Sequence, residues 1–245
     1  MQPSLLCKSH KLRGSRPGIK DIWNAFMVKG ATFTKNDIPI CPTTATETPK
    51  DIIPWTEAKR IYKRERAAGK RKFHISAFVC FYLDDYKFDG PTGIWHKYAQ
   101  ALRILRHFDG VITPDFSTYQ DFAYPIKLGN TYRMRAFVYW LGTKGIPVIN
   151  NVRWGTPETY SYCFDGIEQN SIVAIGTVGS SPRKLIDRPR FEAGLKELVR
   201  VLKPRTIIVY GSDNYPCFDE LRKQDIEIIA FKSHTAQAYE RRQAQ

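Results

Sequence analysis

The sequence predicts an α/β protein with a mainly parallel sheet of about seven strands that alternate with helices. Three observations lead to this class: short apolar runs recur along the chain, helical patterns separate them, and Gly or Pro follows several of the helical segments. A TIM-like or incomplete barrel fits this order of elements. A doubly wound open sheet is the alternative, because sequence spacing does not fix the order of strands in a sheet.

The first half of the chain already shows this alternation. Residues 78–83 form a continuous apolar run, which is typical of a strand buried on both faces. Gly69 and Gly110 follow helical patterns and indicate where those helices end. The predicted elements are a short helix at 22–27, a strand at 37–41, a turn-rich stretch at 42–54, a helix at 55–68, a strand at 78–83, a helix at 92–107 and a strand at 111–113.

The second half repeats the pattern with clearer signals. Pro189 suits the first turn of a helix, and Phe191, Leu195 and Leu198 then recur at helical spacing. The predicted elements are a helical stretch ending at 144, a strand at 146–152, a helical stretch at 156–169, a strand at 171–175, a helix at 188–203, a strand at 206–210, a helix at 217–223 and a strand at 226–231.

Charge divides the chain unevenly. The net charge is +14, and residues 1–72 hold 16 Lys or Arg against 6 Asp or Glu, a net of +10. Residues 1–36 show little periodicity, so we expect a basic, loosely ordered N-terminal arm followed by a single α/β domain over 37–245.

A dense basic cluster lies at residues 59–72. Binding of nucleic acid through such a cluster weakens steeply with added salt. A solvated helix face without any partner is an equal alternative. The residues predicted to contact nucleic acid are Lys59, Arg60, Lys63, Arg64, Lys70, Arg71 and Lys72.

The composition also indicates where in the cell the protein acts. No apolar stretch is long enough to span a bilayer, and residues 1–7 lack the pattern of a secretory signal, so we expect an intracellular protein with no membrane partner. The five cysteines are far apart and form no C-x-x-C pair, which indicates reduced structural thiols.

Acidic residues follow two of the predicted strands. Asp84 and Asp85 follow the run at 78–83, and Asp115 follows the next strand. Carboxyl ends of parallel strands meet at one edge of a sheet, so these three residues are the candidate catalytic groups. Asp85 and Asp115 are the candidate ligands of a metal ion, with Mg²⁺ as the candidate cofactor. Turn-forming and helix-capping aspartates are the structural alternative.

Two further segments at the same edge suit a phosphate-bearing ligand. The loop at 176–181 offers backbone N–H groups from Gly176, Gly179, Ser180 and Ser181. Arg153 beside Trp154 pairs a cation with a stacking surface. A tight strand-to-helix turn and a core tryptophan are the alternatives, since no nucleotide-binding fingerprint occurs in the chain.

Four ordered motifs resemble a family of uncharacterised proteins from phages, plasmids and other bacterial mobile elements. They are 81–88 (FYLDDYKF), 113–119 (TPDFSTY), 163–167 (CFDGI) and 177–179 (TVG), and the likeness spans residues 37–231. The resemblance implies a mobile-element protein acting in the cytoplasm of a bacterial host cell. It supports Asp84, Asp85, Asp115 and Gly179 as motif positions and implies no particular reaction.

The functional expectation is therefore a protein that binds a nucleotide or nucleic acid through phosphate at the carboxyl ends of its strands, with a metal-dependent enzyme as one form of it. A non-catalytic nucleic-acid-binding protein that uses the N-terminal basic surface is the first alternative. A phage-encoded protein that binds a host protein is the second.

Overall fold

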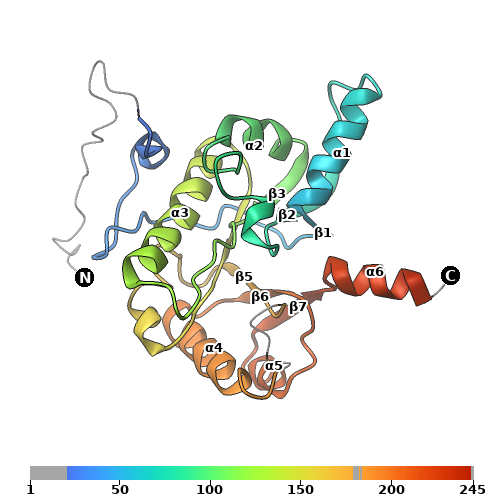
Figure 1. Cartoon of the computed structure of the whole chain (residues 1–245). Helices are drawn as coiled ribbons and strands as arrows, with labels where there is room; N and C mark the ends of the chain where they lie inside the picture. The colour runs from blue at the N-terminus through green and yellow to red at the C-terminus, as the bar shows by residue number, and fades with distance from the viewer. Residues whose placement is uncertain (1–20, 179–181, 183, 244–245) are drawn as a thin grey trace.

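Seven parallel strands form one sheet in the computed structural model, which describes residues 21–178, 182 and 184–243 (Figure 1). The strands are β1 (Ile52–Pro54), β2 (Ile75–Cys80), β3 (Phe108–Ile112), β4 (Val148–Asn151), β5 (Ile172–Gly176), β6 (Thr206–Tyr210) and β7 (Glu227–Phe231). Their order in the sheet is their order in the chain. Doubly wound sheets reverse the strand order at a switch point, so this alternative is excluded and the barrel-like prediction is confirmed.

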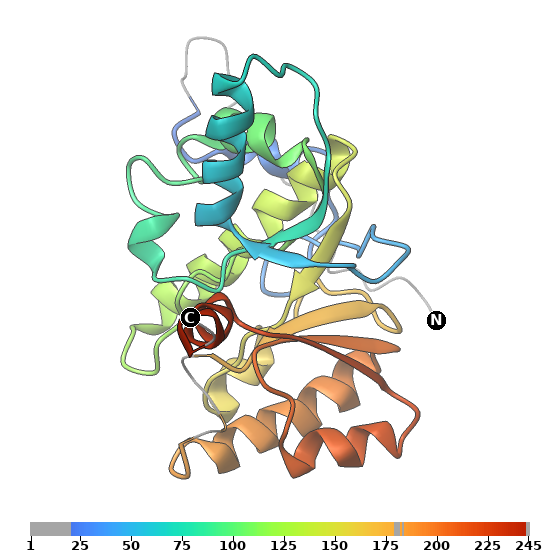
Figure 2. The ribbon, with the colours of Figure 1, turned by 90° about the vertical axis from the view of Figure 1, so that its right-hand side faces the viewer.

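The sheet is an incomplete barrel, because β1 and β7 remain its two edges. It curls with α1, α2 and α3 around one half and α4 and α5 around the other (Figure 2). The helices are α1 (Trp55–Ala67), α2 (Tyr98–Leu105), α3 (Tyr124–Thr143), α4 (Arg188–Leu202), α5 (Pro216–Arg222) and α6 (His234–Gln243), with 3₁₀ turns η2 (Ala25–Val28), η3 (Asp85–Lys87) and η4 (Pro157–Ser161).

Strand register brings the carboxyl ends of the strands to a common level. Gly176 pairs with Tyr210, and Tyr210 pairs with Phe231. On the other half of the sheet, Pro54 pairs with Cys80. The loops that follow these residues therefore emerge on one side of the sheet, which we call the C-terminal rim.

Alternation along the strands separates two apolar layers. In β6, Ile207 and Val209 pack with the helices, whereas Ile208 and Tyr210 face the concave interior. Both sets are buried, which accounts for the continuous apolar run in the sequence.

Segment 37–41 was wrongly predicted as the first strand of the sheet. It makes only isolated bridges, from Pro39 to Phe33 and from Cys41 to Ile167, whereas β1 lies in the stretch predicted as turns. A three-residue edge strand that ends in proline is too short to show a periodic pattern.

The helices differ most from the prediction in three places. The helix predicted at 92–107 begins only at Tyr98, and the stretch 156–169 contains only the single turn η4. No periodic pattern predicted α6, which has few apolar residues. Short or polar helices are held by neighbouring structure more than by their own pattern.

Part of the predicted N-terminal arm falls within the described residues and joins the core. Met27, Val28 and Phe33 are buried in the cluster that includes residues of α3. The remainder of the arm, residues 1–20, lies outside the described part of the chain. Among the described helices, none combines the length and the apolar character that crossing a membrane requires.

Candidate functional site

Stacked rings of Tyr82 and Tyr210 form the floor of the C-terminal rim. Their centroids are 4.9 Å apart with an interplanar angle of 14°. A Cβ on Gly176 would lie 2.8 Å from the Tyr82 ring, so only glycine leaves room for this ring on the strand. Tyr210 is fixed on its other side, because its hydroxyl accepts a hydrogen bond from the backbone N–H of His234 at 2.9 Å.

A chain of hydrogen bonds runs from this floor to Asp115. The Tyr82 hydroxyl donates to Asn151 Oδ1 at 2.9 Å, and Asn151 Nδ2 donates to Asp115 Oδ1 at 2.9 Å. Arg153 binds the other oxygen, Asp115 Oδ2, at 2.5 Å. Asn151 and Arg153 project the same way because they are two residues apart at the end of β4.

In this series of hydrogen bonds, the partners determine which group donates and which accepts. Burial, and then the negative charge of Asp115, hold the pKa of Tyr82 well above its usual value, so the hydroxyl remains a donor. The Asn151 amide must therefore point its oxygen at Tyr82 and its nitrogen at Asp115. Asp115 is held by two donors and is positioned rather than freely rotating.

Asp85 is the second carboxylate near this chain. Its Oδ2 accepts a hydrogen bond from the backbone N–H of Ser117 at 3.3 Å, and its buried Oδ1 has no hydrogen-bond partner among the described residues. Burial raises its pKa, and the charge of Asp115 adds to that effect. A carboxyl group with a raised pKa suits proton transfer near neutral pH.

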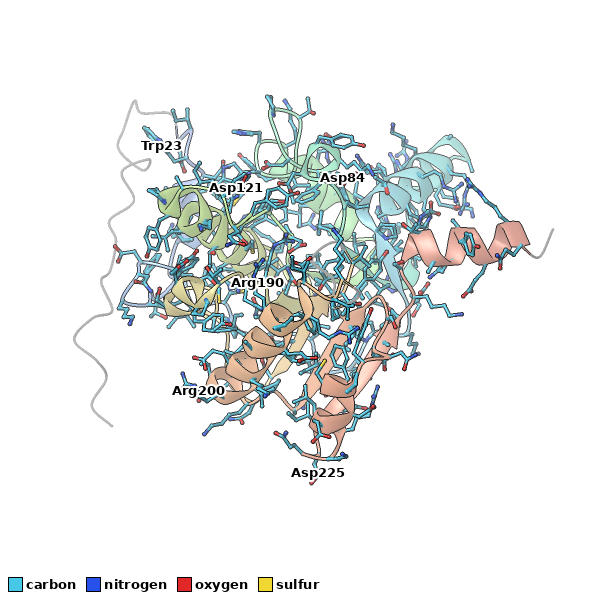
Figure 3. The ribbon with its side chains drawn as sticks, turned by 60° about the horizontal axis from the view of Figure 1, so that its bottom comes forward. Trp23, Asp84, Asp121, Arg190, Arg200 and Asp225 are labelled. Atoms are coloured by element: carbon cyan, nitrogen blue, oxygen red, sulfur yellow. The ribbon has the colours of Figure 1, made fainter. Side chains whose placement is uncertain are left out.

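Asp84 lies apart from these groups. Its side chain is 65% exposed and forms an ion pair with Lys87 at 2.8 Å. Figure 3 labels Asp84 on the loop after β2 and Arg190 on α4. Adjacent residues in an extended segment point in opposite directions, which explains why Asp84 and Asp85 separate.

A cavity of about 90 Å³ opens beside Asp115. This volume is close to that of three water molecules, so it suits a phosphate-sized group and not a whole nucleotide. Its lining combines charged groups with one aromatic wall, and consists of Asp115, Asn151, Val152, Arg153, Trp154, Gly176, Val178, Asp187, Arg190 and Phe191.

Arg190 is the more available cation of this cavity. Its guanidinium lies 3.9 Å from Asp187, at the limit of an ion pair, and its side chain is 43% exposed. Arg190 belongs to the first turn of α4, whose N-terminal dipole also favours an anion. Trp154 forms a fixed wall, since a Cβ on Gly194 of α4 would lie only 2.0 Å from its ring.

The rim has too few clustered carboxylates to hold a metal ion with protein ligands alone. Within the described residues, no group of three or more His, Cys, Asp or Glu side chains lies close enough together to hold one. Asp115 already has a donor on each oxygen, so the remaining carboxylates are Asp85, whose unpartnered Oδ1 is buried, and Asp187, which is only loosely paired with Arg190. Mg²⁺ commonly uses one or two protein carboxylates and completes its shell with water and phosphate oxygens.

The structure brings together five of the predicted site residues at the rim: Asp85, Asp115, Arg153, Trp154 and Gly176. Gly176 serves to admit the Tyr82 ring. Gly179, Ser180 and Ser181 lie outside the described residues. The basic cluster lies on α1 and the turn after it, and meets the rim where Lys59 Nζ donates to the carbonyl of Lys87 at 3.4 Å.

Among the polar residues that the predicted site did not include are Tyr82, Asn151, Asp187 and Arg190. Residues two apart in an extended segment face the same side of the sheet, so Cys80 and Ile149 could have indicated that Tyr82 and Asn151 also face the interior. Arg190 carried no such signal, because it reaches the cavity from a helix that starts well beyond β5.

The third motif, 163–167, has a structural role in the described chain. Asp165 Oδ2 accepts hydrogen bonds from Thr34 Oγ1 at 2.9 Å and Asn36 Nδ2 at 2.7 Å. Gly166 has a φ of +74°, and a Cβ there would lie 2.3 Å from the carbonyl oxygen of Pro39. This motif therefore anchors residues 33–41 against the body of the protein.

Comparison with known sequences finds a matching family and relatives from two mycobacteriophages. Residues 32–232 match the sequence family described as Domain of unknown function (DUF4417). The chain is 31% identical over 202 residues to the Gene 1 protein of Mycobacterium phage D29, which covers 82% of this chain and 69% of that protein. It is 36% identical over 164 residues to the Gene 1 protein of Mycobacterium phage L5, which covers 66% of this chain and 68% of that protein. No solved structure matches the chain.

Proposed function

This chain belongs to the DUF4417 family, and from the geometry of its rim we propose that it binds a phosphate-bearing ligand, a nucleotide or a nucleic-acid end, at the C-terminal rim. The cavity beside Asp115 is the observation that carries the proposal. It places the guanidinium groups of Arg153 and Arg190 around a phosphate-sized space. A guanidinium group can bind phosphate through two parallel N–H···O hydrogen bonds. Ligands of open parallel α/β sheets bind outside the carboxyl ends of the strands.

Each residue has a part in the proposed complex. Arg190 supplies a cation that is only loosely paired, and Arg153 supplies one that Asp115 orients. The Trp154 wall limits the cavity on the side of α4. The body of the ligand lies outside this small cavity, along the rim.

A metal-dependent reaction is the catalytic form of this proposal. Asp85 Oδ1 would bind Mg²⁺ together with phosphate oxygens of the ligand, and its raised pKa would alternatively allow Asp85 to transfer a proton. These two roles differ experimentally, because only the first makes ligand affinity depend on Mg²⁺.

Titration calorimetry tests the binding site. The probes are inorganic phosphate, a nucleoside 5′-monophosphate, and one oligonucleotide with and without a 5′-phosphate, each in EDTA and in Mg²⁺. We expect Arg190→Gln to weaken binding of the phosphorylated probes by about 10- to 100-fold, because it removes a charged hydrogen-bond donor. Arg200→Gln, farther along α4 and exposed, is the matched control and should bind like the unaltered chain.

Two results would contradict the proposal. One is equal affinity of the Arg190→Gln variant and the unaltered chain for every phosphorylated probe. The other is binding by the unaltered chain that does not depend on a terminal phosphate. This would be seen if it binds no phosphate-bearing probe, or if it binds the oligonucleotide equally well without the 5′-phosphate and does not bind the monophosphate.

A further inference from the structure

A second surface, distant from the cavity, carries a strong positive charge. It is formed by α1, the turn at 68–74 and α2, and we call it the α1–α2 basic surface. Its exposed cations without an ion pair in the described chain are Lys63, Arg66, Arg71, Lys72, Arg103 and Arg106.

Tertiary packing joins the two halves of this surface. The Tyr62 ring of α1 lies 5.5 Å from the ring of His107, which follows α2. Phe73 stacks on His107 at 3.9 Å with an interplanar angle of 5°. The turn after α1 is therefore fixed against the end of α2, and Arg103 and Arg106 extend a basic cluster that the sequence shows only at 59–72.

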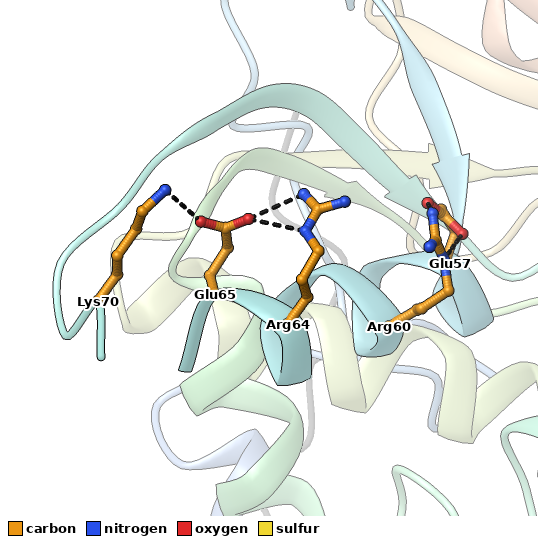
Figure 4. A network of polar contacts seen from close by, with 5 residues as sticks. All are labelled: Glu57, Arg60, Arg64, Glu65 and Lys70. Atoms are coloured by element: carbon orange, nitrogen blue, oxygen red, sulfur yellow. Dashed lines mark hydrogen bonds and ion pairs between the residues drawn. The ribbon is translucent and has the colours of Figure 1, made fainter. Parts of the chain in front are cut away.

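The acidic residues of α1 do not neutralise this surface. Figure 4 shows that Glu57 is bound by Arg60, and that Glu65 is bound by Arg64 and Lys70. Hydrogen bonds from Lys70 and Arg64 lower the pKa of Glu65, so its charge is already used by these two partners.

The acidic residue next to α2 is also occupied. Asp109 Oδ1 lies 2.6 Å from His74 Nε2, and Asp109 Oδ2 accepts a hydrogen bond from Ser76 at 2.8 Å. The six cations named above therefore face solvent without a carboxylate partner in the described residues.

The surface also lacks the groups that bind unpaired bases. None of the exposed large apolar side chains of the described residues belongs to α1, the turn at 68–74 or α2, and Tyr62 and Phe73 are half-buried in the packing between α1 and α2. Proteins that hold single strands combine a basic groove with exposed aromatic rings. Cations on a helix surface without such rings suit phosphates of a paired backbone.

From this arrangement we infer that the α1–α2 basic surface binds the sugar–phosphate backbone of duplex nucleic acid without reading its sequence. Each cation that neutralises a phosphate releases condensed counterions. Affinity for a duplex should therefore fall steeply as salt rises, and the contact at this surface is independent of the cavity at the rim.

Fluorescence anisotropy with labelled 20-base-pair duplexes tests the inference. The full chain is titrated with DNA duplex, RNA duplex and the matching single strand across 50 to 200 mM KCl. The variant Lys63→Gln, Arg66→Gln, Arg71→Gln, Lys72→Gln should bind duplex about 100-fold more weakly in low salt. Its slope of log affinity against log salt should be shallower by about 3 to 4, near 0.9 per lost phosphate contact.

A control variant removes four positive charges from exposed positions on or directly after α3, α4 and α5: Lys144→Gln, Lys196→Gln, Arg200→Gln, Lys223→Gln. It should keep most of the duplex affinity and the full salt slope, and thermal melting verifies that both variants fold.

Preference for either duplex over the single strand supports the inference, and the duplex that binds more tightly shows whether the surface favours DNA or RNA. Equal losses in both variants, tighter binding of the single strand, or an unchanged α1 variant would overturn it. The duplexes carry no terminal phosphate, so this test fails or succeeds separately from the test of the phosphate cavity.

Discussion

Gly176 leaves the space at the floor of the rim that the Tyr82 ring occupies. The ring approaches so closely that any Cβ at this position would overlap it. Tyr82 in turn orients Asn151, and Asn151 orients Asp115. The geometry of the candidate site therefore depends on the absence of one methyl group in β5.

We predict that Gly176→Ala lowers the free energy of unfolding by about 1 to 3 kcal/mol, the cost of overpacking a filled space. Urea denaturation measures this change. Gly129→Ala on α3 is the control, because a Cβ there meets nothing within 4 Å. It should raise stability by up to about 1 kcal/mol, since alanine is the better helix former. A Gly176→Ala variant as stable as the unaltered chain would show that the Tyr82 ring can move freely.

At the scale of elements, one buried side chain of α3 holds the end of β4 and the loop that follows it. Arg135 is 1% exposed and donates to three backbone carbonyl oxygens, those of Asn151, Cys163 and Asp165. Burial lowers its pKa to about 10, which still leaves it charged at neutral pH. This guanidinium ties α3 to the end of β4 and to the loop after it.

We predict that Arg135→Lys destabilises the protein by about 2 kcal/mol or more, because one ammonium group cannot reach three divergent carbonyls and leaves buried acceptors unpaired. The measurement is the midpoint of thermal unfolding at pH 7. Arg200→Lys, at an exposed position on α4, should change it little. Equal midpoints for the two variants would argue against the linking role of Arg135.

At the scale of the whole molecule, the incomplete barrel encloses three of its thiols between layers. Cys41, Cys80 and Cys163 are buried in three different clusters of the core. Burial raises the pKa of each of these thiols to about 12. Because thiolate is the reactive form, both burial and the raised pKa oppose reaction in the folded state.

Thiol labelling should therefore report global unfolding. At pH 8 a thiol with a pKa near 12 is ionised to only about one part in 10⁴, so we predict no labelling of Cys41, Cys80 or Cys163 in the native protein. The half-buried Cys217 is the internal comparison and should react first. Mass spectrometry of peptides identifies the labelled residues. Labelling of any of the three at the rate of Cys217, without denaturant, would show local opening of the core.

The spacing of apolar residues predicted most of the fold, because a strand or helix that packs on one layer repeats its apolar residues at a regular interval along the chain. The strand 206–210 was predicted with the bounds of β6, and the helix at 55–68 differs from α1 by one residue. Elements held mainly by distant contacts escaped this approach. The edge strand β1 and the terminal α6 are examples.

The site was predicted in part for the same reason. Asp85, Asp115 and Arg153 follow strands, so a parallel sheet had to bring them toward one rim. Their partners depend on how far each side chain reaches. Asn151 binds Asp115 across two neighbouring strands, and Arg190 arrives from a helix.

The sequence by itself determined the parallel α/β class, the rim on which polar groups collect, and the concentration of positive charge in residues 1–72, because each is written in local spacing or composition. Only the tertiary structure decided that the sheet is an incomplete barrel, that Arg190 reaches the cavity beside Asp115, and that α2 extends the basic surface of α1. Those outcomes depend on distances between residues far apart in the chain, which are set by the curl of the sheet and the packing of its layers.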